Sequence, residues 1–246
     1  MRLPVYFISD IHLMLSPTRQ GIERQQRLFR FFQQIVQTGG SLFIVGDLFN
    51  FYFEYPHLIP KMYFEFFSKL HQLKQQGIEI HYVLGNHDYW VLDFVTDTLT
   101  TKTYFNDTSF ELAGKKFYVT HGDGIISWDK GYRLLKAIIR NPVFIWFYRW
   151  LHPTIGYNFA QWIANRGHQN THPEAYNLRV QGELKTYALS HMMNGYDYVI
   201  TGHYHQAVDL AVGGGRLVIL GDWIHNNSYG YFDGQDFVLR QWETDE

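Results

Sequence analysis

Five short segments of the chain carry side chains that bind metal ions, and each segment follows a predicted strand. The carboxyl ends of parallel strands are where α/β sheets place their sites. We therefore expect the five segments to meet at one edge of a sheet. They are Asp10-Ile11-His12, Gly46-Asp47, Gly85-Asn86-His87-Asp88, His121 and Gly202-His203-Tyr204-His205.

The side chains of these segments offer only oxygen and imidazole nitrogen, because the chain has no cysteine. This donor set suits Mn²⁺, Fe²⁺, Zn²⁺ or Mg²⁺ and disfavours soft copper sites. One catalytic ion takes about three or four protein ligands, whereas two ions that share a carboxylate use seven naturally. We expect Asp47 to be the shared carboxylate. The predicted ligands are Asp10, His12, Asp47, Asn86, His121, His203 and His205.

The spacing inside the segments is expected to bring the ligands together. In an extended segment, residues two apart lie on the same face, as in Asp10-x-His12 and His203-x-His205. The glycines before Asp47, Asn86 and His203 permit tight turns. A single Gly-Asp at a strand end is usually only a turn. Chance does not explain five such segments that each follow a predicted strand.

The elements that must position these residues follow an alternating pattern. Short buried strands are predicted over residues 5–9, 42–45 and 78–84, with amphipathic helices over 22–36 and 63–73 between them. Repeated β-α units predict a largely parallel sheet with helices outside.

The second half of the chain changes character. A hairpin is predicted over residues 109–120, and a helical segment over about 129–175 departs from the strand pattern. A helix over 174–193 and a strand over 198–201 then lead into Gly202, and hairpin-like strands complete the chain. We expect one domain over the whole chain, into which the helical segment is inserted as a cap.

Composition excludes several classes of protein. The 246 residues carry a net charge of −2 and contain no apolar run long enough to predict a membrane-spanning helix. The N-terminal residues do not resemble a secretory signal. We expect a cytoplasmic protein that does not bind nucleic acid, because an acidic body repels phosphate backbones.

Aromatic and basic residues are concentrated in and around the predicted cap. Eight aromatic residues lie between Phe144 and Trp162, where Arg149 is the only charged residue. From Lys130 to Lys185 the net charge is +6, which leaves −8 for the rest of the chain. Such a segment is typical of a surface that docks on anionic lipids. An ordinary packed helical subdomain would also explain the aromatic residues, and both interpretations stay open.

Taken together, the five segments resemble the signature of the calcineurin-like metallophosphoesterase family. The resemblance implies an α/β fold, a four-layer sandwich of two central mixed sheets flanked by helices. It implies one divalent ion on Asp10, His12, Asp47 and His205, and a second on Asp47, Asn86, His121 and His203. The chemistry implied is attack of a metal-bound hydroxide on phosphorus.

The same resemblance implies a role for His87. In the family, a histidine after the asparagine ligand, held by the next aspartate, often protonates the leaving oxygen or stabilises the transition state. His87 and Asp88 match that pattern, and an imidazole with a carboxylate partner can be cationic near neutral pH. The alternative is that His87 has a purely structural role beside the ligands.

Within that family the chain is most similar to the UDP-2,3-diacylglucosamine hydrolases. The similarity rests on His121-Gly122-Asp123-Gly124, Asp129-Lys130-Gly131-Tyr132, the helical insertion and Leu220-Gly221-Asp222-Trp223. Those enzymes of lipid A synthesis, peripheral on the inner membrane, release UMP and 2,3-diacylglucosamine 1-phosphate. The resemblance implies two Mn²⁺ ions, a nucleotide-linked lipid substrate and acyl chains received by the aromatic insertion. The substrate-binding residues it implies are Asn86, His87, Asp129, Tyr132, Asn165 and Arg166.

Two departures from the hydrolase pattern leave the substrate open. The hydrolases typically have arginine where this chain has His87, and usually glutamate where it has Asn50. Arginine cannot act as an acid, whereas histidine can. A phosphoesterase of the same fold acting on another nucleoside pyrophosphate or phosphodiester is one alternative. A non-catalytic metal-binding scaffold is the other.

Overall fold

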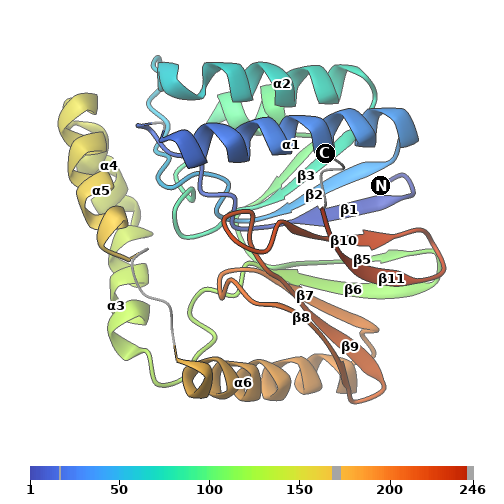
Figure 1. Cartoon of the computed structure of the whole chain (residues 1–246). Helices are drawn as coiled ribbons and strands as arrows, with labels where there is room; N and C mark the ends of the chain where they lie inside the picture. Colours follow the sequence, from blue (N-terminus) through green and yellow to red (C-terminus); the bar gives the residue numbers. More distant parts are fainter. Residues whose placement is uncertain (17, 168–172, 243–246) are drawn as a thin grey trace.

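The computed structural model describes residues 1–16, 18–167 and 173–242, and it leaves out the side chains of residues 161 and 163–167. Two mixed β-sheets lie face to face, with helices on their outer faces (Figure 1). The predicted four-layer α/β sandwich is therefore confirmed.

The first sheet is built from the strands that the β-α repeat predicts, together with strands from the end of the chain. Neighbouring strands from β1 to β4 are parallel, and β10 and β11 add antiparallel pairs at one edge. In spatial order the strands are β11 (Phe237–Gln241), β10 (Ser228–Phe232), β1 (Val5–Ile8), β2 (Ser41–Val45), β3 (Glu79–Val83) and β4 (Lys102–Tyr104).

The second sheet combines two hairpins with a parallel centre. The β5–β6 and β8–β9 pairs are antiparallel, whereas β7 runs parallel to both β6 and β9. Its strands in spatial order are β5 (Thr108–Leu112), β6 (Lys115–Thr120), β7 (Tyr198–Thr201), β9 (Gly215–Leu220) and β8 (Ala207–Val212).

Helices α1 (Arg19–Thr38), α2 (Phe64–Gln75) and α6 (Glu174–Met193) form the outer layers. Helices α1 and α2 cover the first sheet and α6 covers the second (Figure 1). Along α6 the buried residues Val180, Leu184 and Ala188 recur every four positions, so one stripe of the helix faces the sheet. A short 3₁₀ turn, η1 (Lys61–Tyr63), precedes α2.

The core between the two sheets is largely aromatic. The ring of Phe7 on β1 stacks on Phe43 of β2 and on Phe117 of β6, with centroids 5.5 and 6.2 Å apart. Aromatic pairs of this kind stabilise by about 0.5–1.5 kcal/mol beyond the area they bury. This packing fixes one sheet against the other and so aligns the strand ends that carry the predicted ligands.

Helices α3 (Lys130–Ile139), α4 (Pro142–Arg149) and α5 (Pro153–Gly167) form a separate group, here called the cap. The cap stands beside the ends of both sheets, on the left of Figure 1. Two elements of the body were not predicted from the sequence, the edge strand β4 and the π-helix η2 (Phe94–Leu99). Within the described ranges, no helix is long and apolar enough to span a bilayer.

Candidate metal centre

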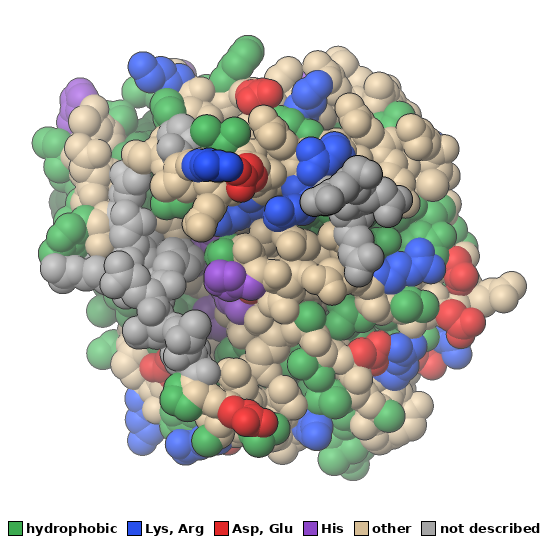
Figure 2. Space-filling model, viewed as in Figure 1, with side chains coloured by type: hydrophobic (Ala, Val, Ile, Leu, Met, Phe, Trp, Pro, Cys, Tyr) green, Lys and Arg blue, Asp and Glu red, His purple; other side chains and the backbone are tan. Residues whose placement is uncertain are grey.

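The five predicted segments meet where β1, β2, β3, β6 and β7 end. Each segment follows directly on one of these strands, and Figure 2 shows histidine side chains (purple) near the middle of the face that it presents. Donor atoms of these segments form three mutually close groups, each within 4.8 Å: Asp10, His12 and His205; His12, Asp47 and His87; Asp47, His121 and His203.

The first group places two imidazoles around one carboxylate oxygen. Asp10 Oδ1 lies 3.6 Å from His12 Nε2 and 3.4 Å from His205 Nε2, and the two Nε2 atoms are 3.3 Å apart. Asp10 Oδ1 is buried, and no described residue donates a hydrogen bond to it. A buried carboxylate oxygen without a donor is costly. A divalent cation between these three atoms would remove that cost, so the donor set fits a metal ion.

The first two of the three groups share His12 and are taken together as the first donor group; the second donor group, with His121 and His203, is organised around Asp47. His121 Nε2 lies 3.2 Å from Asp47 Oδ2 and 3.1 Å from Asn86 Oδ1. The same Asp47 Oδ2 is 3.9 Å from His12 Nε2, which belongs to the first group. Asp47 therefore lies between the two groups, as a bridging carboxylate must.

Left-handed turns, rather than extended backbone, present the ligands. Seven non-glycine residues of the described chain have positive φ, and five of them are predicted ligands. The prediction that Asp-x-His and His-x-His lie on one face of an extended strand is therefore wrong. Positive φ is uncommon for residues other than glycine, although aspartate and histidine adopt it more readily than most, and such residues cluster at functional sites. The five are Asp10 (54°), His12 (48°), Asp47 (51°), His203 (66°) and His205 (54°).

Two glycines make room for the ligands, as the sequence predicted for tight turns. Gly46 has a φ of 81°, and a Cβ atom built there would collide with the ring of His121. A Cβ at Gly85 would collide with the carboxylate of Asp47. Side chains at these two positions would displace the donor atoms of both groups.

Hydrogen bonds behind the ligand rings fix their orientation. His121 Nδ1 donates to the carbonyl of Val45 (2.9 Å), and His205 Nδ1 lies 3.3 Å from Asp222 Oδ2. Each bond turns Nε2 toward the centre, an arrangement that metal-binding histidines commonly use. Asp222 is 1% exposed and was not predicted as a site residue. Gly221-Asp222 at a strand end repeats the Gly46-Asp47 pattern, and that signal could have revealed it.

The carboxylates of the centre favour a positive charge on one neighbouring imidazole, that of His121. Burial lowers the pKa of His121, but Asp47 and Asp10 outweigh burial and raise it to about 10. Burial and the neighbouring His121 lower the pKa of His203 to about 4. Burial would raise the pKa of Asp47, but His121 and His87 hold it well below its ordinary value. Carboxylates that favour a positive charge on His121 also favour a cation beside them.

His87 faces the centre, but Asp88 does not hold its ring. His87 Nδ1 donates to the carbonyl of Asn50 (2.6 Å), and Nε2 lies 3.9 Å from Asp47 Oδ2. Asp88 is buried and accepts from the backbone N–H groups of Leu48 (2.6 Å) and Gly85 (2.8 Å), and from a tyrosine hydroxyl. The expectation of a His87–Asp88 pair is thus corrected. Asp88 instead ties together the two loops that carry Asp47 and Asn86.

A cavity of about 500 Å³ opens beside the centre. Four predicted substrate-binding residues line it: Asn86, His87, Asp129 and Tyr132. The Asp129 carboxylate also caps α3, because it accepts from the backbone N–H of Tyr132 (3.0 Å). The side chains of the two others, Asn165 and Arg166, lie outside the described residues.

Asp123, two residues after the ligand His121, anchors the cap. Its Oδ2 atom lies 2.8 Å from Lys136 Nζ and 3.0 Å from Arg140, and it accepts from the Tyr132 hydroxyl (3.2 Å). These three residues are four apart on α3 and therefore share a face. Lys136 and Arg140 belong to the positively charged segment that was predicted to attract lipids. They instead form ion pairs with Asp123 within the protein.

The aromatic residues of the cap divide between two faces. Tyr148 and Tyr157 pack inward against a cluster that contains Phe51, Phe53 and Trp90 of the body. Phe144 and Phe147 instead line an open, largely apolar hollow of about 440 Å³ on the cap, and the binding of acyl chains by the aromatic segment stays a prediction. More than half of the surface of five aromatic residues of the cap is exposed: Trp146 (55%), Phe147 (63%), Trp150 (75%), Phe159 (52%) and Trp162 (53%).

Comparisons with known proteins show which family the chain is similar to. Residues 3–207 match the profile of the calcineurin-like phosphoesterase family. A UDP-2,3-diacylglucosamine hydrolase of Porphyromonas gingivalis is 32% identical over 262 aligned positions, which cover 100% of both chains. Proteins of the same name from Hahella chejuensis (23%, covering 96% of each chain) and Aeromonas hydrophila (26%, covering 90% and 91%) are more distant. A solved archaeal phosphodiesterase has a TM-score of 0.46 at 13% identity, with 97% and 99% of the two chains covered.

Proposed function

The chain belongs to the calcineurin-like phosphoesterase family of metal-dependent phosphoester hydrolases, and we propose that it cleaves the pyrophosphate of UDP-2,3-diacylglucosamine. The products would be UMP and 2,3-diacylglucosamine 1-phosphate. The full-length likeness to a hydrolase of that name supports this substrate. The observation that carries the proposal is the pair of donor groups around Asp47, which opens into a cavity lined by Asn86, His87, Asp129 and Tyr132.

The seven predicted ligands would hold two divalent cations, with Asp47 shared between them. We propose Mn²⁺, although Fe²⁺, Zn²⁺ and Mg²⁺ accept the same donors. When bound, such ions supply a nucleophilic oxygen at neutral pH and neutralise the charge of the phosphoryl group. The left-handed turns and buried hydrogen bonds hold the donor atoms in place before substrate arrives, so little reorganisation is needed.

We propose that His87 protonates the oxygen that leaves phosphorus. The Asn50 carbonyl fixes the proton of the ring on Nδ1, so Nε2 is the atom that faces the centre. In the imidazolium form Nε2 carries the proton that is transferred, and the ring is neutral afterwards. The side chain of His87 is 22% exposed and lines the cavity, so a substrate oxygen can reach it.

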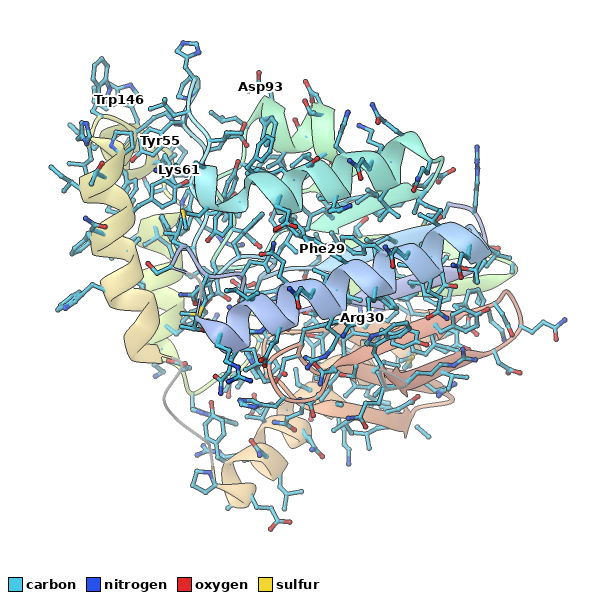
Figure 3. All side chains as sticks on the ribbon, turned by 45° about the horizontal axis from the view of Figure 1, so that its top comes forward. Phe29, Arg30, Tyr55, Lys61, Asp93 and Trp146 are labelled. Carbon is cyan, nitrogen blue, oxygen red and sulfur yellow. The ribbon has the colours of Figure 1, made fainter. Side chains whose placement is uncertain are left out.

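We propose that the exposed side of the cap contacts the anionic cytoplasmic face of the inner membrane. Trp146 and Trp150 are more than half exposed there, and the basic residues Lys130 and Arg133 are exposed on α3. Figure 3 places Trp146 at the same end of the molecule as Lys61 of the body. Indole rings lie well at the depth of lipid head groups, and lysine and arginine are attracted to anionic lipids.

Co-sedimentation with phosphatidylglycerol vesicles tests the membrane contact. Trp146→Ser with Trp150→Ser is expected to weaken binding, because each change removes an exposed indole from the contact. Substituting the exposed Met193 at the end of α6 by serine is the matched control. Equal binding by the double variant and the unmodified chain would contradict the contact.

Product analysis tests the substrate. The purified chain with Mn²⁺ is expected to release UMP from UDP-2,3-diacylglucosamine far faster than from UDP-glucose, which lacks acyl chains.

His87 stands where the hydrolases typically have arginine, and this departure favours a second candidate, a phosphodiesterase of the same fold. Rapid cleavage of bis(p-nitrophenyl) phosphate with the lipid pyrophosphate left intact would select that candidate.

A further inference from the structure

One wall of the cavity is formed by side-chain amides that are hydrogen-bonded to one another. Gln181 Nε2 donates to Gln206 Oε1 (2.8 Å), and Gln206 Nε2 donates to Asn177 Oδ1 (3.3 Å). Asn177 and Gln206 line the cavity. Because each amide has two donor hydrogens and two acceptor lone pairs, both keep hydrogen-bonding capacity for a ligand. Gln181 orients Gln206, and Gln206 in turn orients Asn177.

The amide wall, formed by Asn177 and Gln206, lies near the start of α3, the first helix of the cap. Asn177 is in the first turn of α6, next to Tyr176, which also lines the cavity. Trp128 and Tyr176 pack against the same apolar cluster, and the Arg179 guanidinium lies 3.8 Å from the centre of the Trp128 ring. Burial, with a contribution from the charge of Asp129, raises the pKa of Tyr176. The start of α6 is therefore close to the residues that lead into α3.

We propose that Asn177 and Gln206 bind the hydroxyl groups of the substrate's acylated glucosamine ring, and that Gln181 is a positioning residue for both. The assignment rests on the proposed function. A sugar hydroxyl both donates and accepts, which matches an amide that offers both. The nucleoside would then occupy the other side of the cavity, which Ile224 and His225 line.

The position of the wall favours the sugar over the nucleobase. In a 2,3-diacylated sugar the acyl chains are attached to the ring itself. With the pyrophosphate at the metal centre, the ring must lie between that centre and the apolar side chains of the cap. Asn177 and Gln206 line the same cavity as Asp129, which caps α3, and as the predicted ligands Asp47 and His203.

Substrate-specific kinetics test the assignment. Asn177→Ala and Gln206→Ala are each expected to lower kcat/KM for UDP-2,3-diacylglucosamine by about 10- to 100-fold, mainly through KM, because each removes hydrogen bonds to the ring. Activity on bis(p-nitrophenyl) phosphate, which has no sugar, is expected to fall far less. Gln181→Leu is expected to produce a smaller loss with the same selectivity.

Asn194→Ala is the matched control. Asn194 is at the other end of α6, where its amide donates to the Ser190 carbonyl (2.8 Å) at an exposed position. This variant is expected to match the unmodified chain on both substrates. An equal loss on both substrates in Asn177→Ala and Gln206→Ala, or no loss on either, would overturn the assignment.

Product inhibition separates the sugar from the nucleoside. In Asn177→Ala, inhibition by 2,3-diacylglucosamine 1-phosphate is expected to weaken while inhibition by UMP stays the same. Weaker inhibition by UMP alone would assign the wall to the nucleoside and overturn the proposal. Failure of the unmodified chain to cleave the lipid pyrophosphate, with the diester still cleaved, would overturn the proposed function and this subsite together.

Discussion

At the scale of single residues, the site depends on buried polar contacts that orient each ligand. Asp222 Oδ2 lies 3.3 Å from His205 Nδ1, while Oδ1 accepts the backbone N–H groups of Ile224 (2.8 Å) and His225 (2.6 Å). Burial would raise the pKa of Asp222, but these bonds hold it well below its ordinary value. A carboxylate fixed in this way can hold one tautomer of His205.

We expect Asp222→Asn to weaken metal binding without unfolding the chain. Asparagine keeps the size and one acceptor oxygen but removes the charge that orients His205, and such changes typically cost about 10- to 100-fold in metal affinity. Isothermal titration of the apo chain with Mn²⁺ measures the effect. Asp233→Asn, in an exposed turn, is the control. Unaltered affinity in Asp222→Asn would show that Asp222 does not position His205.

His87→Gln is expected to lower kcat about 10²- to 10⁴-fold while Mn²⁺ affinity changes little, because glutamine cannot donate a proton as an acid. The measurement is kcat for a substrate with a poor leaving group, such as the lipid pyrophosphate. The same variant should lose less activity on bis(p-nitrophenyl) phosphate, whose leaving group needs no proton. Equal losses on the two substrates would argue against proton donation by His87.

A pH effect on stability is expected from His81, which lies on β3 and is not one of the predicted ligands. Burial lowers its pKa below the ordinary 6.5, although Glu79 acts in the opposite direction, and the N-terminal amine and Lys102 add to the lowering. The unfolded chain therefore binds more protons below pH 6.5, and the free energy of unfolding falls as pH drops through that value. His81→Phe should reduce this slope in urea denaturation curves measured from pH 7 to pH 5. An unchanged slope would exclude His81 as its source.

At the scale of elements, loops rather than strands complete the site. The strands position five segments at one edge, but left-handed turns then aim the side chains, as at Asp10 and His12. The long connection from β2 to α2 contains Asn50, which holds His87, and Glu54, which supports η2. The β-α pattern predicts that such a connection exists, but not which of its backbone atoms will contact the site.

Glu54→Gln tests how the body holds η2. Glu54 is 1% exposed, and its two oxygens accept the backbone N–H groups of Leu92 and Phe94 (2.8 Å each). Glutamine replaces one acceptor by a donor, so a buried N–H loses its partner and the free energy of unfolding should fall by about 1–3 kcal/mol. Urea denaturation measures it. Glu65→Gln, at an exposed position on α2, should change stability by less than about 0.5 kcal/mol. Similar values for both variants would contradict the role of Glu54.

At the scale of the whole molecule, the sequence predicted the sandwich and the meeting of the five segments better than it predicted the contacts of individual side chains. Ligand types at five strand ends were enough to indicate two donor groups, because strand order brings those ends together. The sequence could not predict which cap side chains face the body. Tyr148 and Trp146 are both aromatic residues of α4, yet Tyr148 packs against the body and Trp146 is exposed to solvent. Ion pairs of Lys136 and Arg140 with Asp123 likewise depend on how α3 packs.

The central claim is that two donor groups sharing Asp47 drive hydrolysis of a lipid-linked pyrophosphate. The most direct test is a titration of the apo chain with Mn²⁺, with UMP release from UDP-2,3-diacylglucosamine measured at each step. The rate is expected to saturate at two ions per chain, and Asp47→Asn is expected to abolish it because both groups lose a donor. Full turnover with one ion per chain, or turnover that persists in Asp47→Asn, would contradict the claim.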